Sequence, residues 1–238
     1  MQEAIDNFQD ALSANFRELL LGMAAFELGM RSLQENLSGS VSILVAGGAS
    51  SEPIHVSTLI HNQDTVKRGN IELFQSKAIA LWNDLIVDLY TVSVCNHIDH
   101  SVRSAALKKS KVDIDFSLEI LIPDQIKNAL VRDFSFSNHG SKLDVIKKIF
   151  PMASYSSQLS FIKKHVEIRN SFQHHSGIMH AGGLKILGVD KISIKDDDGN
   201  DVNVCAGEKI HISVVEIDKL KSALFELSSH MESCLDED

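Results

Sequence analysis

Apolar residues recur at intervals of three and four along most of the chain, the spacing that places them on one face of an α-helix. The pattern predicts a long helix over residues 2–36 and another over residues 71–98, whose wide apolar stripe around Trp82 is typical of a helix buried in a bundle. Shorter helices are predicted over residues 124–134, 142–150, 156–174 and 215–234. The sequence therefore predicts a mainly α-helical bundle.

Two stretches favour strands instead. Residues 41–61 contain apolar, partly β-branched segments on either side of Gly47-Gly48, which predicts a hairpin with a return strand over residues 54–60, or an irregular excursion. Near the C-terminus, alternating residues surround the turn sequence Asp197-Asp198-Gly199-Asn200. They predict a small β-meander with strands at residues 191–195, 202–205 and 209–213.

No repeat or low-complexity linker divides the chain, so we expect a single domain over residues 1–238. Its parts are an N-terminal helix and excursion (1–69), a helical core (70–180), and the β-meander with a final helix (181–238). Residues 104–122 fit no single pattern, because a Lys-rich piece is followed by short alternation.

Composition limits the class of protein. A hydrophobic share of 44% excludes a disordered polymer, and three cysteines without metal-like spacing make a disulfide framework or a cysteine zinc site unexpected. No basic segment leads into an apolar stretch at the N-terminus, and we expect a cytoplasmic protein with no membrane partner. Gly47-Gly48 lacks the third glycine of a dinucleotide fingerprint and the Lys-Ser/Thr of a P-loop, so a turn explains it better than a nucleotide site.

Charge is unevenly distributed along the chain. The formal net charge is −9, yet residues 103–175 carry 12 basic and 7 acidic side chains. A locally basic segment in an acidic protein can bind a polyanion, since attraction and counterion release act near the contact. The basic residues of this segment could also simply be solvent-exposed side chains of a loop or a helix end.

The most informative segment is Arg169-Asn170-Ser171-Phe172-Gln173-His174, at the end of a predicted amphipathic helix. Asn170 and His174 are i,i+4 neighbours and share a helix face, whereas Arg169 lies about 100° around the helix from Asn170. One chain therefore supplies an incomplete arrangement. A two-fold axis beside this helix would bring a second Arg and His opposite the first pair.

Arg169-Asn170 followed by His174 resembles the R-x4-6-H motif of HEPN-domain ribonucleases, in which a polar residue commonly follows the Arg. The specific likeness covers about ten residues. A looser one, in the Trp82 helix and the β-turn tail, extends over residues 70–235 and is similar to HEPN proteins of bacterial defence loci. In the HEPN toxins that are paired with a nucleotidyltransferase, a Tyr lies two residues after the His and receives AMP. Ser176 stands there in this chain, so that modification is not expected.

The resemblance implies a homodimeric, metal-independent endoribonuclease with Arg169, His174 and Asn170 as catalytic residues and no cofactor. The partners would be RNA and an antitoxin or defence-system protein. Lys163, Lys164 and His175 are the candidate RNA contacts, and none of the eleven histidines builds a helical zinc site. The alternative is a non-catalytic helical interaction or regulatory subunit in which Arg169 pairs with Glu167 or with an acid on a neighbouring helix.

Overall fold

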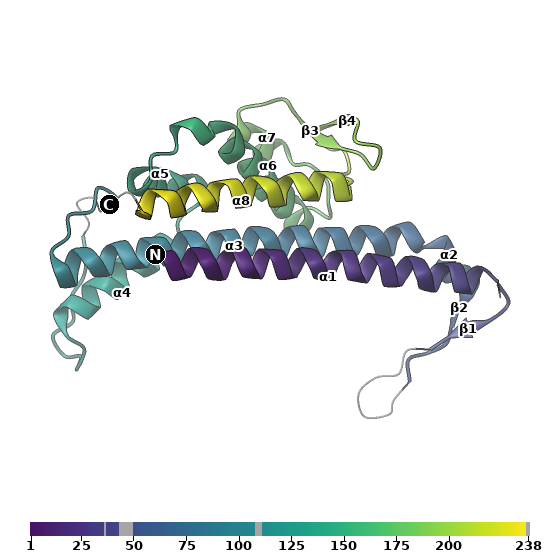
Figure 1. Cartoon of the computed structure of the whole chain (residues 1–238), viewed down its shortest axis with the longest axis horizontal. Helices are drawn as coiled ribbons and strands as arrows, with labels where there is room; N and C mark the ends of the chain where they lie inside the picture. The colour runs from purple at the N-terminus through teal and green to yellow at the C-terminus, as the bar shows by residue number, and fades with distance from the viewer. Residues whose placement is uncertain (36, 43–49, 108–110, 237–238) are drawn as a thin grey trace.

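Two long antiparallel helices lie side by side along the whole molecule (Figure 1). The computed structural model describes residues 1–35, 37–42, 50–107 and 111–236. Helix α1 (Gln2–Gln34) packs on α3 (Gln63–His100), and edge-to-face ring pairs join Phe8 to Trp82 and Phe16 to Phe74. The residues of these pairs rise in number along α1 and fall along α3, as antiparallel packing requires.

Helices α5 to α8 lie along one side of this pair, whereas α4 lies beside the C-terminal end of α3 and α2 lies at the opposite end (Figure 1). Helix α8 packs on α1, α3 and α6, and α4 and α5 pack on α3. The mainly α-helical prediction is confirmed. The bounds are α2 (Val56–His61), α4 (Ile122–Ser135), α5 (His139–Ile149), the 3₁₀ turn η1 (Ala153–Tyr155), α6 (Ser156–His174), α7 (Ala181–Leu187) and α8 (Val214–Asp236).

Two small antiparallel hairpins complete the fold. Strand β1 (Ser40–Val41) pairs with β2 (Ile54–His55), and β3 (Lys191–Lys195) pairs with β4 (Asp201–Cys205), so that Lys191 lies opposite Cys205. The predicted C-terminal hairpin is therefore present. Gly47-Gly48 lies outside the described residues.

One predicted strand is too long, since only residues 54–55 of the predicted 54–60 form a strand, and another is absent. Residues 56–60 belong to α2 rather than to a return strand. Residues 209–213 form no third strand, and only Lys209 makes an isolated bridge, to Ile178. Ile210 and Ile212 are nevertheless buried while His211 is not. The alternation in this segment therefore reflects burial of every second side chain, without a neighbouring strand to bond to.

The hydrophobic core is built around α3. Trp82, Ile86 and Leu89 are fully buried, and the core cluster takes residues from both long helices, from α4 to α8 and from the β3–β4 hairpin. Helix α3 is long and apolar enough to cross a membrane, but half of its most apolar stretch is buried inside the protein. Packing in the bundle thus accounts for its composition.

A buried carboxylate ties α6 to α8 and to the C-terminal hairpin. Glu216, on α8, is 1% exposed and accepts hydrogen bonds from Lys164 Nζ at 2.6 Å and from His165 Nε2 at 3.2 Å. Its other oxygen accepts from the backbone N–H of Lys195 at 2.9 Å. Burial raises the pKa of Glu216, but the His165 hydrogen bond and the Lys164 charge outweigh burial and lower that pKa to about 2.

We predict that Glu216→Gln lowers the free energy of unfolding by about 2–4 kcal/mol, because the largely buried Lys164 ammonium then lacks its carboxylate partner. The folded-state pKa of Glu216 lies below its unfolded value, so the stabilisation is present at neutral pH and disappears as pH falls from about 4.5 to about 2. Urea unfolding of both proteins across this pH range should show their difference shrinking. Glu226→Gln, an exposed site on α8, serves as the control. An equal loss in both variants would contradict the prediction.

Candidate functional site

The last turn of α6 carries the predicted motif and ends in a fixed turn. The backbone N–H groups of His175 and Gly177 both donate to the Ser171 carbonyl, at 2.9 and 3.0 Å. Ser176 and Gly177 adopt left-handed backbone angles, with φ of 53° and 76°. The Gly177 carbonyl then accepts from Ile210 N–H at 2.8 Å. The chain leaving the motif is thus anchored to the segment before α8.

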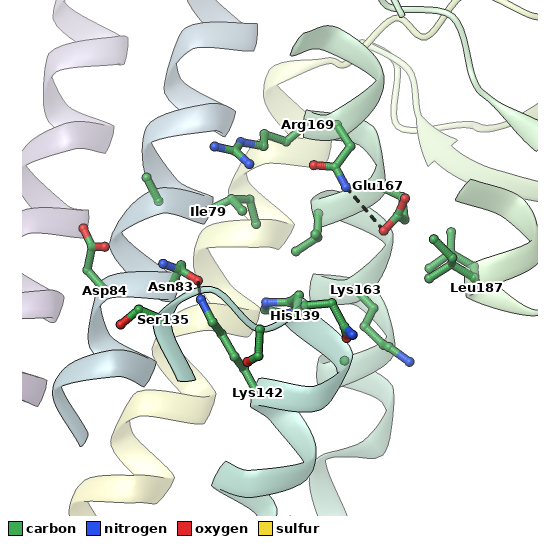
Figure 2. A pocket seen from close by; sticks show the side chains of 17 residues that line it. Ile79, Asn83, Asp84, Ser135, His139, Lys142, Lys163, Glu167, Arg169 and Leu187 are labelled. Atoms are coloured by element: carbon green, nitrogen blue, oxygen red, sulfur yellow. Dashed lines mark hydrogen bonds between the residues drawn. The ribbon is translucent and has the colours of Figure 1, made fainter. Parts of the chain in front are cut away.

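A pocket of about 830 Å³ opens between α3, α5, α6 and α7 (Figure 2). Its volume lies within the usual range of small-ligand sites. Helix α6 contributes Lys163, Glu167, Arg169 and Asn170, together with apolar Val166. The other polar lining residues are Asn83 and Asp84 of α3, Ser135 of α4, Ser137, the α5 cap Asn138, and His139 and Lys142 of α5.

Arg169 reaches this pocket without an ionic partner. Its side chain is half-buried and points from α6 towards α3 (Figure 2), and its buried Nε has no hydrogen-bond partner. In the described part of the chain it makes no ion pair, either with Glu167 or with an acid of another helix. The ion pair of Arg169 with Glu167 or with an acid of a neighbouring helix, which the alternative interpretation suggested, is thus not formed within the described residues.

Asn170 lies beside Arg169 and contacts a partly buried acid. Its Nδ2 donates to Glu167 Oε1 over a long 3.5 Å, so the amide is weakly held. Burial raises the pKa of Glu167, while the Asn170 hydrogen bond and the Lys163 charge lower it. A Cβ on Gly183 would lie 3.2 Å from Glu167 Oε2. The glycine thus lets α7 approach this wall of the pocket closely.

His174 is exposed at the end of α6 and is not among the pocket-lining residues. Its ring lies edge-on to His175 at 6.5 Å, and the His175 ring stacks on His180 at 4.5 Å. The structure therefore places Arg169 and Asn170 together at the pocket and leaves the imidazole on the open surface one turn beyond. Solvent can reach the His174 ring, which proton transfer requires.

The two predicted lysine contacts have different environments. Lys163 lines the pocket, whereas Lys164 donates to Glu216 and, at 2.8 Å, to the Ser193 carbonyl. With its side chain only 13% exposed, Lys164 is committed to the buried ion pair. Of the two lysines, Lys163 is therefore the one whose side chain lies at the pocket, whereas Lys164 is held by Glu216 and the Ser193 carbonyl.

Two pocket residues were missed by the sequence patterns. Lys142 is 4% exposed and donates to Asn83 Oδ1 at 2.7 Å, and burial lowers its pKa. Burial, reinforced by the charges of Lys142 and Lys163, lowers the pKa of His139 to about 4, so its ring is neutral at pH 7. The sequence did carry a signal that Lys142 is buried. Lys142 lies four residues before Ile146 and therefore on the same, apolar face of its helix.

Within the described ranges, no three or more His, Cys, Asp or Glu side chains gather in a group that could hold a metal ion. His180, beside the motif, is engaged as the cap of α7, where its Nδ1 accepts from Gly182 N–H at 3.1 Å.

Comparison with known proteins gives no relative. No family model, no curated protein and no solved structure matches the chain.

The turn after the motif gives a test of how the site is held. Gly177→Ala should lower the free energy of unfolding by about 1–2 kcal/mol, because φ is 76° and a Cβ would lie 3.2 Å from the Phe172 ring. Gly29→Ala, in open space on α1, is the matched control and should stabilise the protein by up to about 1 kcal/mol. Chemical denaturation measures both, and an unchanged or higher stability in Gly177→Ala would contradict the geometry.

Proposed function

We propose that this protein is a metal-independent endoribonuclease of the HEPN type, acting in bacterial defence or in a toxin–antitoxin system. The observation that carries the proposal is at the end of α6. Arg169 faces a pocket with no ionic partner in the described structure, Asn170 lies next to it, and the exposed imidazole of His174 follows one turn later. The resemblance to the R-x4-6-H motif supports the same conclusion.

The proposed reaction uses a nucleophile that RNA itself supplies. The ribose 2′-oxygen attacks the adjacent phosphorus, the bond to the 5′-oxygen breaks, and the products end in a 2′,3′-cyclic phosphate and a 5′-hydroxyl. His174 moves the proton, since an imidazole changes charge near neutral pH. Arg169 stabilises the extra negative charge of the phosphorane with a guanidinium that stays charged. Asn170 orients one of these groups or donates to a phosphate oxygen.

A second copy of the chain completes this arrangement. His174 lies five positions after Arg169 in the α-helix, which sets the directions of the two side chains about 140° apart. One chain therefore directs the guanidinium into the pocket and the imidazole onto the neighbouring surface. A homodimer with its two-fold axis beside α6 would place the His174 of one subunit across from the Arg169 of the other. Lys163 and His175 would then contact flanking phosphates.

A non-catalytic interaction subunit is the second candidate, because large apolar side chains lie exposed near both ends of α4. Phe116, Leu121 and Phe136 are 83%, 71% and 87% exposed. Large exposed apolar side chains are typical of surfaces that bind other proteins where they form a contiguous patch. A defence-system or antitoxin partner would suit both candidates, so this surface does not decide between them. Activity does.

RNA cleavage in EDTA tests the proposal. We expect the wild-type protein to cut RNA, His174→Ala to lower the rate by about 10²–10⁴-fold, and Arg169→Ala by about 10²–10³-fold. His100→Ala removes an exposed histidine at the far end of α3 and should leave the rate unchanged. Melting temperatures of all variants verify that each is folded.

Equal cleavage by the wild type and both motif variants would identify a contaminating nuclease and overturn the proposal. Absence of cleavage by the wild type, with and without co-expressed neighbouring genes from the same locus, would favour the interaction subunit.

Assembly gives an independent prediction. The protein should be a dimer by light scattering, and excess His174→Ala mixed into wild-type protein should lower the activity further than simple dilution does. The reason is that mixed dimers hold one imidazole instead of two. A monomer with full activity would contradict the composite cleft.

A further inference from the structure

We propose that the pocket between α3, α5, α6 and α7 is a phosphate-binding site, and that Lys142, His139 and Arg169, which line it, attract the anion. Two of these residues lie outside the motif at the end of α6. The phosphate would belong to a larger ligand, either one unit of an RNA backbone or a free phosphorylated small molecule. Binding requires no proton carrier, so the inference goes beyond cleavage and holds whether or not RNA is cut.

Lys142 is the first observation that carries it. Its side chain is 4% exposed, and Asn83 Oδ1, a neutral acceptor, is its hydrogen-bond partner at 2.7 Å. In the described ranges its ammonium makes no ion pair, although the Asp84 carboxylate is near enough to act on its pKa. Burying a cation without a paired anion is unfavourable. A bound phosphate would supply the missing charge.

Two more buried side-chain nitrogens in the same pocket lack partners. The Nε of Arg169 and the Nε2 of His139 are both shielded from solvent and form no hydrogen bond within the described structure. His139 is close enough to Lys142 and Lys163 for their charges to act on it. Unsatisfied buried polar groups are few in native proteins, and a bound ion or water is one explanation for them. Here they line the same pocket (Figure 2).

The backbone of α5 adds to this attraction. Asn138 caps the helix by accepting from Ser141 N–H at 2.9 Å, and the first residues, His139 and Gly140, line the pocket. The N–H groups of a first helical turn have no partner within the helix, and they favour anions.

The opposite walls indicate the size and nature of the ligand. Ile79, Val166, Ile186 and Leu187 line the pocket with apolar surface, and about 830 Å³ exceeds what a phosphate ion fills. Two acids, Asp84 and Glu167, also reach the pocket. Burial raises the pKa of Glu167, and both carboxylates oppose a second anionic group in the pocket. A phosphate joined to an uncharged organic group therefore fits better than a multiply charged inorganic anion.

Calorimetric titration tests the site with three probes: inorganic phosphate, uridine 3′-monophosphate and a 2′-O-methyl hexauridylate, which lacks the attacking hydroxyl and is not cut by the proposed chemistry. We expect wild-type protein to bind at least one of them, and Lys142→Met to weaken that binding about tenfold, the size typical of one charge-assisted hydrogen bond. Lys147→Met is the matched control, since Lys147 lies on the same helix with its side chain 46% exposed, and it should bind as the wild type does.

The probes also distinguish the source of the phosphate. A hexamer bound more than about tenfold tighter than the mononucleotide supports an RNA backbone, and equal affinities support a free phosphorylated molecule. If Lys142→Met fails to fold, Arg169→Gln takes its place with the same expectation.

No binding of any probe by the wild type, or equal weakening by Lys142→Met and Lys147→Met, would overturn the site. The cleavage assay tests a separate claim. Binding without cleavage would support the phosphate site and contradict the nuclease. Cleavage without binding that depends on Lys142 would support the nuclease and contradict the phosphate site.

Discussion

The buried carboxylate of Glu216 fixes how α6 is rotated in the bundle, and the candidate site depends on that rotation. Two consecutive residues of α6, Lys164 and His165, donate to the same carboxylate oxygen, which leaves α6 little freedom to turn about its axis. Lys163, Asn170 and His174 lie on the side of the helix away from His165, within about 40° of one another. The same contact that stabilises the fold therefore sets which side chains of α6 face the pocket and the open surface.

The pocket combines features that do not serve stability. A lysine is almost fully buried beside a neutral amide, a histidine is kept neutral by burial and by neighbouring cations, and an arginine is left without an acid. Each arrangement is unfavourable in the unliganded protein. Perturbed groups gathered in one pocket are typical of functional sites, because binding or catalysis benefits from charges that the fold has not neutralised. Arg169 belongs both to the proposed cleavage and to the proposed phosphate site, which gives the two proposals one physical basis.

Local patterns predicted the long helices and the C-terminal hairpin well and the other small elements poorly. The bounds of α6 agree with the prediction at residues 156–174, because its apolar spacing and its Gly177 stop are local signals. Helix α7 was missed since two glycines hide its pattern. Residues 209–213 alternate like a strand because Ile210 and Ile212 enter the core. Alternation reports burial, and the sequence does not tell whether a partner strand is available.

In the candidate site, too, local spacing could be predicted and long-range packing could not. Arg169, Asn170 and His174 are near one another in sequence, so their spacing could be recognised before the fold was known. The approach of Lys142 and His139 to Arg169 depends on how α5 packs against α3 and α6, which is long-range information. The engagement of Lys164 in a buried ion pair was not predicted for a related reason, since its partner, Glu216, lies 52 residues later in the chain.

Replacing one ribose by deoxyribose in an RNA substrate tests the central claim most directly, that the protein supplies charge and proton transfer while RNA supplies the nucleophile. Cleavage in EDTA would be mapped on an oligonucleotide with a single 2′-deoxy residue on the 5′ side of the cut. We expect that one cut to vanish, the neighbouring cuts to persist, and every upstream product to end in a 2′,3′-cyclic phosphate. Cleavage that continues at the deoxy position would show that another nucleophile attacks, and would contradict the account.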